Sequence, residues 1–302
     1  MRVRRFTAAL AAIGLVGLVG CSSGAGDDAG TPDATVPVET DAEFEAGTTM
    51  ADLAEAGTIK VGTKFDQPGF GLISPQDVPE GFDVEIAKII AGALGIAADD
   101  IEWIESVSAN REPFLQNGEV DMVVATYTIN DERKQIVDFA GPYYVAGQDI
   151  MVAAGNPLAV EGPESFADIR VCSVTGSTPA GYVQENFPDA DLTLFAEYSL
   201  CAEALKNDQV DAVTTDNVIL TSFVAQDPES FELIGAPFTE EPYGIGVPQE
   251  DDKTFCEWVN EALNEMYEDG SWAAAFEATV GTGGVETPEP PATGSCETPG
   301  AA

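Results

Sequence analysis

The feature that most constrains the fold of this chain is an alternation of short strand-like runs with helical patterns between residues 58 and 280. Strand-like runs, rich in apolar and β-branched residues, cover 58–62, 101–105, 120–125, 148–154, 171–174 and 212–215. Helical patterns cover 82–94, 113–116, 200–206, 218–224, 254–269 and 271–280. Strands that alternate with helices in this way predict an α/β protein with mostly parallel sheets.

Two segments of the chain resemble each other. The run LQNGEVDMVVAT at 115–126 aligns with LKNDQVDAVTTD at 205–216, and each predicts a helix end, a turn, a Val-Asp pair and a strand. Two lobes that each carry this unit would place Thr126 and Asp216 at the carboxyl ends of matching strands, where open α/β sheets bind ligands. The alternative is that a common helix-turn-strand arrangement arose twice by chance.

The charge and the absence of histidine exclude several functions. The 302 residues include 53 Asp and Glu against 12 Lys and Arg, which gives a net charge of −41. Such an acidic surface repels phosphate backbones, so we expect no nucleic-acid partner. Without histidine the chain lacks the Ser-His and Cys-His nucleophile pairs and the two-histidine zinc motifs. Most hydrolase chemistry is thereby excluded, and we expect no cofactor and no metal.

The N-terminal residues 1–20 have the pattern of a secretory signal, because three arginines precede an uncharged run too short to span a bilayer. The sequence LVGC that ends at Cys21 resembles a bacterial lipobox, in which this cysteine is lipidated and becomes the first residue. An ordinary signal peptide with a chance cysteine is the alternative. Residues 22–51 and 282–302 contain few large apolar residues and are predicted to be a disordered tether and a loose C-terminal tail. The folded body then covers about 52–281, held on the outer face of the cell membrane.

Four cysteines remain when Cys21 is set aside, and in an oxidising compartment four cysteines allow three disulfide pairings. We favour Cys172 with Cys201, since neighbouring parallel strands would bring a strand residue close to the start of the next helix. We also favour Cys256 with Cys296, which would pin the tail to the helix around residue 258. A zinc site is the weaker alternative, because the chain has no histidine and no CxxC spacing.

Three longer segments carry a family resemblance: NREPFLQNGEVD at 110–121, ATYTINDERK at 125–134 and VDFAGPYY at 137–144. Shorter matches, in the same order along the chain, are GFDV at 81–84, TGST at 175–178, VDAV at 210–213, TD at 215–216 and YGIG at 243–246. Over about 55–281 the chain resembles the polar amino acid-binding proteins of ABC importers, solute-binding family 3. Within this family, GTKFDQPG at 62–69 and TYT at 126–128 are most similar to the glutamate-binding lipoproteins of high-GC Gram-positive bacteria.

The resemblance implies a two-lobed fold of the periplasmic-binding-protein type II, in which two hinge strands join the lobes and the lobes close on a ligand. The crossings should lie near 143–147 and 239–243. Lobe 1 would then comprise 52–144 and 243–281, and lobe 2 would comprise 145–242.

The resemblance also assigns the groups that hold an amino acid. Arg133 matches the arginine that binds the α-carboxylate, a task that suits the planar guanidinium, and Thr128 matches the hydroxyl beside it. Asp216 matches the acid that pairs with the ammonium. The alternatives are a solvated arginine and an aspartate that caps the following helix, and Asp216 could have both roles.

The turn TGSTP at 175–179 matches the second-lobe loop that contacts ligand on closure, and its free N–H groups favour an anion. Ser177 is as well explained as a helix cap as by ligand contact, whereas for Thr178 we favour contact. Thr126, at the end of its strand, completes the hydroxyl groups assigned to the site.

Three of the nine basic residues that follow the signal, Lys64, Arg111 and Arg133, lie in loops that the family directs at the cleft. A local positive cluster favours a ligand with a second carboxylate, so we expect glutamate first, then aspartate or glutamine. Lys64 stands where glutamine-binding relatives carry an acid, which supports this expectation. The alternative is that Lys64 and Arg111 form salt bridges with the abundant surface acids.

The resemblance therefore implies a lipid-anchored, monomeric receptor that captures an acidic amino acid and delivers it to an ABC permease in the membrane. It needs no catalytic residue. Two alternatives are a secreted enzyme on the same fold, such as a dehydratase of an aromatic amino acid precursor, and a ligand-sensing or adhesive lipoprotein.

Overall fold

A computed structural model of the chain describes residues 36–40 and 42–298. The predicted signal at 1–20, the predicted lipidation site Cys21 and half of the predicted tether lie outside the described residues. Within the described part, no helix combines the length and the apolar character needed to cross a bilayer.

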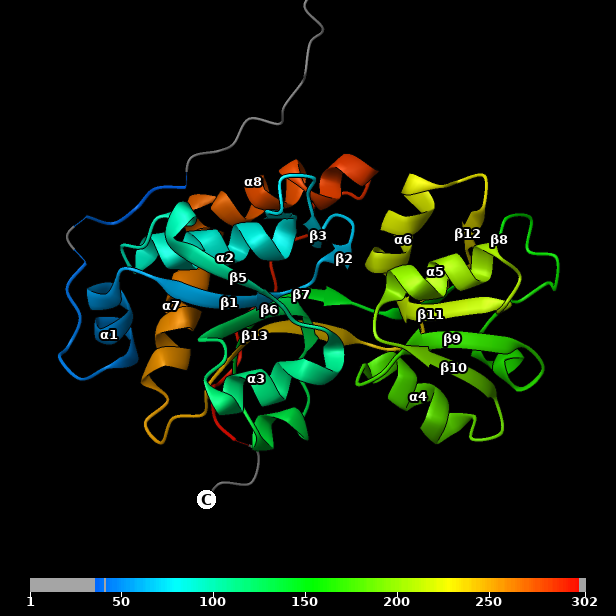
Figure 1. Ribbon diagram of the computed structural model, residues 1–302, viewed down its shortest axis with the longest axis horizontal. Helices are drawn as coiled ribbons and strands as arrows, with labels where there is room; N and C mark the ends of the chain where they lie inside the picture. The colour runs from blue at the N-terminus through cyan, green and yellow to red at the C-terminus, as the bar shows by residue number, and fades with distance from the viewer. Residues whose placement is uncertain (1–35, 41, 299–302) are drawn as a thin grey trace, which may run out of the picture. The chain divides into compact units, whose positions relative to one another are not determined.

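Helices and strands alternate along the described chain (Figure 1). The α-helices are α1 Thr49–Ala56, α2 Phe82–Ala93, α3 Arg111–Asn117, α4 Thr178–Asn186, α5 Tyr198–Lys206, α6 Asn217–Gln226, α7 Thr254–Asp269 and α8 Ser271–Ala278. The 3-10 helices are η1 Ala98–Asp100, η2 Ser108–Asn110, η3 Arg133–Gln135, η4 Pro163–Ala167 and η5 Val280–Gly283. The strands are β1 Ile59–Thr63, β2 Asp66–Gln67, β3 Gly71–Ile73, β4 Pro79–Glu80, β5 Ile101–Glu105, β6 Met122–Thr128, β7 Asp138–Ala146, β8 Gln148–Ala153, β9 Arg170–Val174, β10 Asp191–Phe195, β11 Ala212–Asp216, β12 Phe231–Leu233 and β13 Glu241–Val247.

Two five-stranded sheets organise these elements. The first sheet has the order β5-β1-β6-β13-β7, and the second has the order β10-β9-β11-β8-β12. In each sheet the first three strands of this order pair in parallel, and the remaining pairings are antiparallel. Helices cover both faces of each sheet: α2 and α8 lie opposite α3 on the first, and α5 and α6 lie opposite α4 on the second (Figure 1). The predicted two-lobed α/β fold is confirmed, but the expectation of mostly parallel sheets is wrong, because half of the pairings in each sheet are antiparallel where the chain crosses between the lobes or returns. We call the parts built on the two sheets the first and second lobes.

The chain crosses between the lobes twice. It leaves the first sheet at the end of β7, passes through Gly147 and enters β8; it returns between β12 and β13. The two crossings pair as an antiparallel ribbon, with Glu241 opposite Ala146. A Cβ atom at Gly147 would lie 2.8 Å from the carbonyl oxygen of Thr239, so only glycine allows the crossings to approach this closely.

The internal similarity in the sequence corresponds to a repeated structural unit. In the first lobe, Asp121 precedes β6; its Oδ2 accepts the Lys60 N–H at 2.8 Å, and its own N–H bonds to Lys60 O at 2.9 Å. In the second lobe, Asp211 precedes β11 and makes the same two bonds to Arg170, each at 2.8 Å. Each aspartate thus joins a parallel strand to the start of its neighbour, as the similar sequences predicted.

The folded body begins before residue 52, where the tether was predicted to end. Glu39 N–H bonds to Gly92 O at 2.9 Å, and Phe44 packs edge to face against Trp258 with ring centroids 5.7 Å apart. Helix α1, which Thr48 caps, buries Met50. The low average hydrophobicity of the predicted tether did not indicate that its few apolar residues pack against the folded body.

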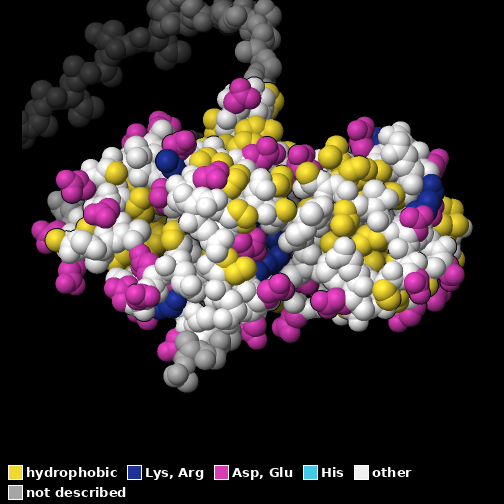
Figure 2. Space-filling view, turned by 60° about the horizontal axis from the view of Figure 1, so that its bottom comes forward, with side chains coloured by type: hydrophobic (Ala, Val, Ile, Leu, Met, Phe, Trp, Pro, Cys, Tyr) yellow, Lys and Arg dark blue, Asp and Glu magenta, His cyan; other side chains and the backbone are white. Residues whose placement is uncertain are grey.

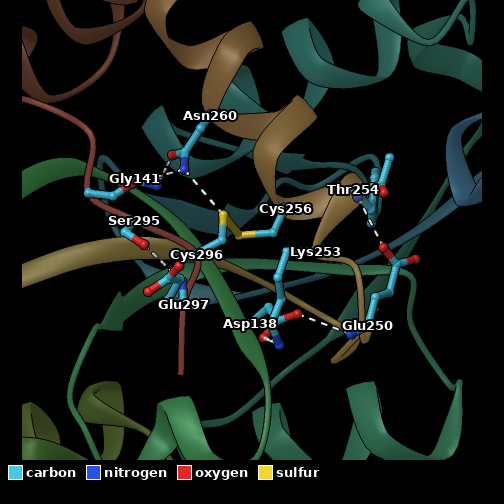
Figure 3. The surroundings of a disulfide bond; sticks show 12 residues. Asp138, Gly141, Glu250, Lys253, Thr254, Cys256, Asn260, Ser295, Cys296 and Glu297 are labelled. Atoms are coloured by element: carbon cyan, nitrogen blue, oxygen red, sulfur yellow. Dashed lines mark hydrogen bonds and ion pairs between the residues drawn. A yellow bond between two sulfur atoms is a disulfide. The ribbon is translucent and has the colours of Figure 1, made fainter. Parts of the chain in front are cut away.

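The C-terminal segment is also attached, although its composition predicted a loose tail. Its described residues, up to 298, have no regular structure after η5, but Gly294 N–H bonds to Gly141 O at 2.6 Å on the edge strand β7. Asn260 accepts the Gly141 N–H at 2.7 Å and donates to Gly294 O at 3.1 Å, so one side chain clasps both segments (Figure 3). The segment therefore covers part of an exposed sheet edge, which protects that edge from pairing with another chain.

Both disulfides have the predicted partners. Cys172 on β9 pairs with Cys201 on α5, and Cys256 on α7 pairs with Cys296 in the C-terminal segment (Figure 3). The Cys172–Cys201 disulfide joins two elements of the second lobe. The Cys256–Cys296 disulfide holds the C-terminal segment against the first lobe.

Removing the second disulfide is expected to destabilise the protein. Because Cys256 and Cys296 are 40 residues apart, the bond restricts the unfolded chain, and its loss should lower the free energy of unfolding by about 3 kcal/mol. A Cys256→Ser/Cys296→Ser variant should accordingly unfold at a lower urea concentration than the parent. An unchanged midpoint would show that the hydrogen bonds of Gly294 hold the segment without the disulfide.

Candidate functional site

Loops and strand ends from both lobes meet around a small cavity of about 10 Å³. Its lining from the first lobe is Ser108, Arg111, Thr126 and Thr128, and its lining from the second is Ser177, Thr178, Pro179, Tyr198, Thr215, Asp216 and Ile219. Six of the eight predicted ligand-binding residues are in this set. Thr126 and Asp216, which the internal similarity placed in matching strands, thus lie at one cavity.

A larger groove of about 780 Å³ adjoins the cavity and shares Ser108, Ser177 and Thr178 with it. Arg133, a seventh predicted residue, lines this groove. Lys64, the eighth, donates a hydrogen bond to Ser108 Oγ at 2.9 Å and so lies beside the same wall. Figure 2 shows Lys and Arg side chains near the middle of one face, while Asp and Glu side chains predominate around its edge.

Arg133 bridges the two lobes. Residue 133 begins η3 in the first lobe; its Nη1 donates to Thr128 O at 2.6 Å, and its Nη2 donates to Gly176 O of the second lobe at 3.0 Å. Its Nε pairs with Glu112 at 3.1 Å. Only 7% of the residue is exposed, so it is not the solvated arginine that was the alternative.

Lys64 and Arg111 are buried without a carboxylate partner among the described residues, being 3% and 2% exposed. Arg111 donates instead to the backbone oxygens of Ser108, Ala125 and Thr126 at 3.1–3.3 Å. The alternative that both residues pair with surface acids is therefore wrong. Asp66 and Asp83 attract Lys64 without contacting it, and a buried cation with no carboxylate in direct contact is costly, which favours an anionic ligand.

The buried cations influence one another. Burial, followed by repulsion from Arg111, lowers the pKa of Lys64 to about 7. Burial, followed by repulsion from Arg133, lowers the pKa of Arg111 to about 10. Both guanidiniums lie over the ring of Tyr127, whose centroid is 4.2 Å from Arg111 Cζ and 5.1 Å from Arg133 Cζ, and the ring attracts both cations.

Asp216 supplies an acid on the opposite wall. It ends β11 and occupies the N-cap position of α6, yet its side chain makes no capping hydrogen bond. Its Oδ2 accepts the Tyr243 hydroxyl at 2.6 Å, and its Oδ1 has no partner among the described residues. Burial, followed by the charge of Glu241, raises the pKa of Asp216 to about 7, while the Tyr243 bond opposes this.

The two hydroxyl residues of the second-lobe turn have different roles. Ser177 caps α4 by accepting the Ala180 N–H at 3.1 Å, so its side chain has the structural role that the sequence left open, although it also lines the cavity. Thr178 Oγ1 donates to Glu241 at 2.7 Å and lies 3.3 Å from Thr128 Oγ1 of the first lobe. Thr178 therefore lies at the junction of the lobes.

Thr126 has an unusual backbone with φ +42°, and a buried network holds it there. Its N–H bonds to Asp83 Oδ2 at 2.8 Å, and its hydroxyl donates to Gln67 at 2.9 Å. The Tyr143 hydroxyl bonds to Asp83 Oδ1 at 2.6 Å. Burial raises the pKa of Asp83 to about 6 despite these bonds.

Sequence reasoning missed several lining residues, among them Ser108, Tyr198 and Thr215. Thr215 directly precedes Asp216, and Tyr198 begins the helix that follows β10, so the preference of ligands for the carboxyl ends of strands could have indicated both. Ser108 lies in η2, which no sequence pattern indicated. The residues that the structure describes contain no cluster of acids and cysteines able to hold a metal ion.

Comparison with known proteins agrees with this architecture. Residues 59–282 match the bacterial extracellular solute-binding proteins, family 3. The glutamate-binding protein GluB of Corynebacterium efficiens is 39% identical over 252 residues, which cover 79% of this chain and 84% of that protein. The glutamine-binding protein GlnH of Bacillus subtilis is 38% identical over 234 residues, covering 77% and 84%. The crystal structure of an L-cysteine solute receptor from Neisseria gonorrhoeae superposes with a TM-score of 0.74 at 29% identity, covering 79% and 97%.

The two-lobed α/β fold with a cavity between the lobes is shared with solute receptors such as the one for L-cysteine. The chain belongs to the bacterial extracellular solute-binding proteins, family 3. It is accordingly a binding protein and not an enzyme.

Proposed function

We propose that this protein is the receptor of an ABC importer for an acidic amino acid, with glutamate preferred over aspartate and glutamine. The observation that carries the proposal is the group of three buried cations, Lys64, Arg111 and Arg133, at one inter-lobe site. Two of them have no carboxylate partner among the described residues. A ligand with two carboxylates would supply the missing negative charge.

Each residue has a distinct role in this proposal. Arg133 binds the α-carboxylate through its guanidinium, with the Thr128 hydroxyl beside it. Asp216 accepts the ammonium through its unpartnered Oδ1. Lys64 and Arg111 receive the side-chain carboxylate. Thr126, Ser177 and Thr178 complete the wall with hydroxyl and backbone groups.

The choice of glutamate over glutamine rests on charge, because relatives with either name are similarly identical to this chain. Glutamine would leave the ammonium of Lys64 without a carboxylate in direct contact, since Asp66 and Asp83 act on it only from nearby. Glutamate would provide one, and burial makes that charge pair worth more than it would be in water.

Ligand entry requires the lobes to separate. A cavity of about 10 Å³ has room for no more than one water molecule, far less than an amino acid needs. The cross-lobe bond from Arg133 to Gly176 supports a closed arrangement, so the proposal includes opening about the two crossing strands, capture and closure.

Gly176 offers a direct test of closure. A Cβ atom there would lie 2.8 Å from Ala109 Cα in the other lobe, so Gly176→Ala should hinder closure and weaken glutamate binding about tenfold. Gly155→Ala is the matched control, because Gly155 has a similar φ of +81° but a Cβ atom there would meet nothing within 4 Å. Isothermal titration calorimetry would compare them, and equal affinities would contradict the closure model.

The proposal extends to the position of the protein in the cell. Lipidation at Cys21 would hold a monomeric receptor at the outer face of the membrane, beside the permease that receives its ligand. The lipobox-like sequence supports this, as does membership of a family of extracellular proteins.

Calorimetry with a panel of amino acids tests the function as a whole. We expect micromolar or tighter binding of glutamate, weaker binding of aspartate and glutamine, and no chemical change of the ligand. The absence of binding to every amino acid would refute the proposal. Tighter binding of glutamine than of glutamate would refute the roles of Lys64 and Arg111.

A further inference from the structure

Asp66 makes a contact between the lobes that the ligand-binding roles do not explain. It lies on β2, between β1 and α2 of the first lobe, and is separated by 132 residues from its partner Tyr198. Its Oδ2 accepts the backbone N–H of Tyr198 at 2.8 Å and that of Ser199 at 3.2 Å. These are the first two residues of α5 in the second lobe.

Helix α5 has no cap of its own. Glu197 occupies its N-cap position, but the Glu197 side chain makes no capping hydrogen bond. Helix α4 of the same lobe differs, because its own Ser177 caps it. The first N–H groups of a helix need an external acceptor, and for α5 the acceptor comes from the other lobe.

We propose that Asp66 fastens the closed lobes by capping α5 across the cleft and thereby slows ligand release. The inference rests on the proposed function and adds a residue that acts through lobe closure without touching the ligand. A carboxylate at a helix N-terminus gains two charge-assisted hydrogen bonds and a favourable interaction with the helix dipole. When the lobes separate, water replaces both partners, so this stabilisation belongs to the closed state alone.

The contact between Asp66 and α5 lies where a bound ligand can influence it. Tyr198, whose N–H Asp66 accepts, is one of the residues that line the cavity. Lys64, two residues before Asp66, belongs to the proposed subsite for the side-chain carboxylate. A ligand that orders Tyr198 and Lys64 also brings Asp66 and the start of α5 together. Occupancy of the site is thereby coupled to the capping of α5 by Asp66.

The test measures glutamate association and dissociation by stopped-flow fluorescence on the purified protein and its variants. Asp66→Ala should raise the dissociation rate about tenfold and leave the association rate within about twofold, because the bonds form after encounter. Asp66→Asn should fall between Ala and the parent, since its amide oxygen can still cap the helix. Strands β2, β3 and β4 form a small three-stranded sheet, and Glu80→Ala, which removes an exposed acid from β4 of that sheet, should match the parent.

Three outcomes would contradict the proposal that Asp66 fastens the closed lobes. They are an unchanged dissociation rate in Asp66→Ala, an equal change in Asp66→Asn and Asp66→Ala, and an equal change in Glu80→Ala. The second would assign the effect to the charge of Asp66 on nearby Lys64, and the third to net charge. If the parent itself bound no amino acid, the proposed function would fail before the variants were compared, so the two failures are distinguishable.

Discussion

Replacing Arg133 with alanine is expected to weaken glutamate binding by two to three orders of magnitude. The guanidinium is the only cation among the eight assigned residues that also bonds to both lobes, through Thr128 O and Gly176 O. Its loss would leave the ligand α-carboxylate buried without a counter-charge and would also remove a closing contact. Truncating one member of a buried charge pair costs about 2–5 kcal/mol, which corresponds to the expected range.

Two variants show whether the loss is specific. Arg133→Lys keeps the charge but not the planar fork, so it should recover only part of the affinity. Arg170→Ala removes an arginine whose ion pair with Asp211 lies at the surface of the second lobe, with 43% of the side chain exposed. It should lower stability slightly and leave binding unchanged. Calorimetry at constant pH and salt makes the comparison, and parental affinity in Arg133→Ala would refute the assigned carboxylate site.

The fold was predictable where local pattern and tertiary structure agree. Residues 254–269 have an apolar stripe at helical spacing, and α7 has the predicted bounds. Strand β13 is different, because Pro242, Gly244 and Gly246 weaken any local strand pattern. It is a strand because it fits between β6 and β7, segments about 100 residues away, and such pairing leaves little trace in a single sequence.

The site was predictable at the level of residue type and less so at the level of contact. A family resemblance indicated Arg133, but it did not indicate the ion pair with Glu112 on α3. Burial of Lys64 and Arg111 runs against the general exposure of charged residues, so composition favoured surface salt bridges. Only the packing of α3 against η2 and β6 shows that both cations are enclosed and that hydroxyl and backbone oxygens, not carboxylates, receive their hydrogen bonds.

The acidity of the chain and the charge of its site serve different purposes. A net charge of −41 would repel an anionic ligand at long range, but salt screens that field beyond about 8 Å at physiological ionic strength. Within the site, the few buried cations act at contact distance and in a less polar medium. Binding of a dicarboxylic amino acid is therefore compatible with a strongly acidic surface, whereas binding of an extended polyanion is not.

Asp216→Asn is expected to weaken glutamate binding at least about hundredfold at pH 8, because the ammonium would lose its charge partner. The pH dependence gives a more specific signature. Burial raises the pKa of Asp216 to about 7 in the closed, ligand-free arrangement, and a bound ammonium would favour the carboxylate and lower that pKa. Its contribution is therefore complete above pH 7 and declines as the pH falls below 7, by up to tenfold per unit.

Lys64 should determine how the affinity for glutamate changes above pH 7, the alkaline arm of the pH profile. It thereby provides an internal control for Asp216, which determines the acid arm. Its pKa of about 7 in the free protein should rise when a side-chain carboxylate binds, and its contribution should decline as the pH rises above 7. The parent affinity should thus peak near pH 7.

Asp216→Asn should flatten the acid arm alone, and Lys64→Met the alkaline arm alone. Asp227→Asn makes the same chemical change at a surface ion pair with Lys206 and should keep both arms. Calorimetric titrations from pH 5 to 9 would measure these arms, and an acid arm that persists in Asp216→Asn would show that another group binds the ammonium.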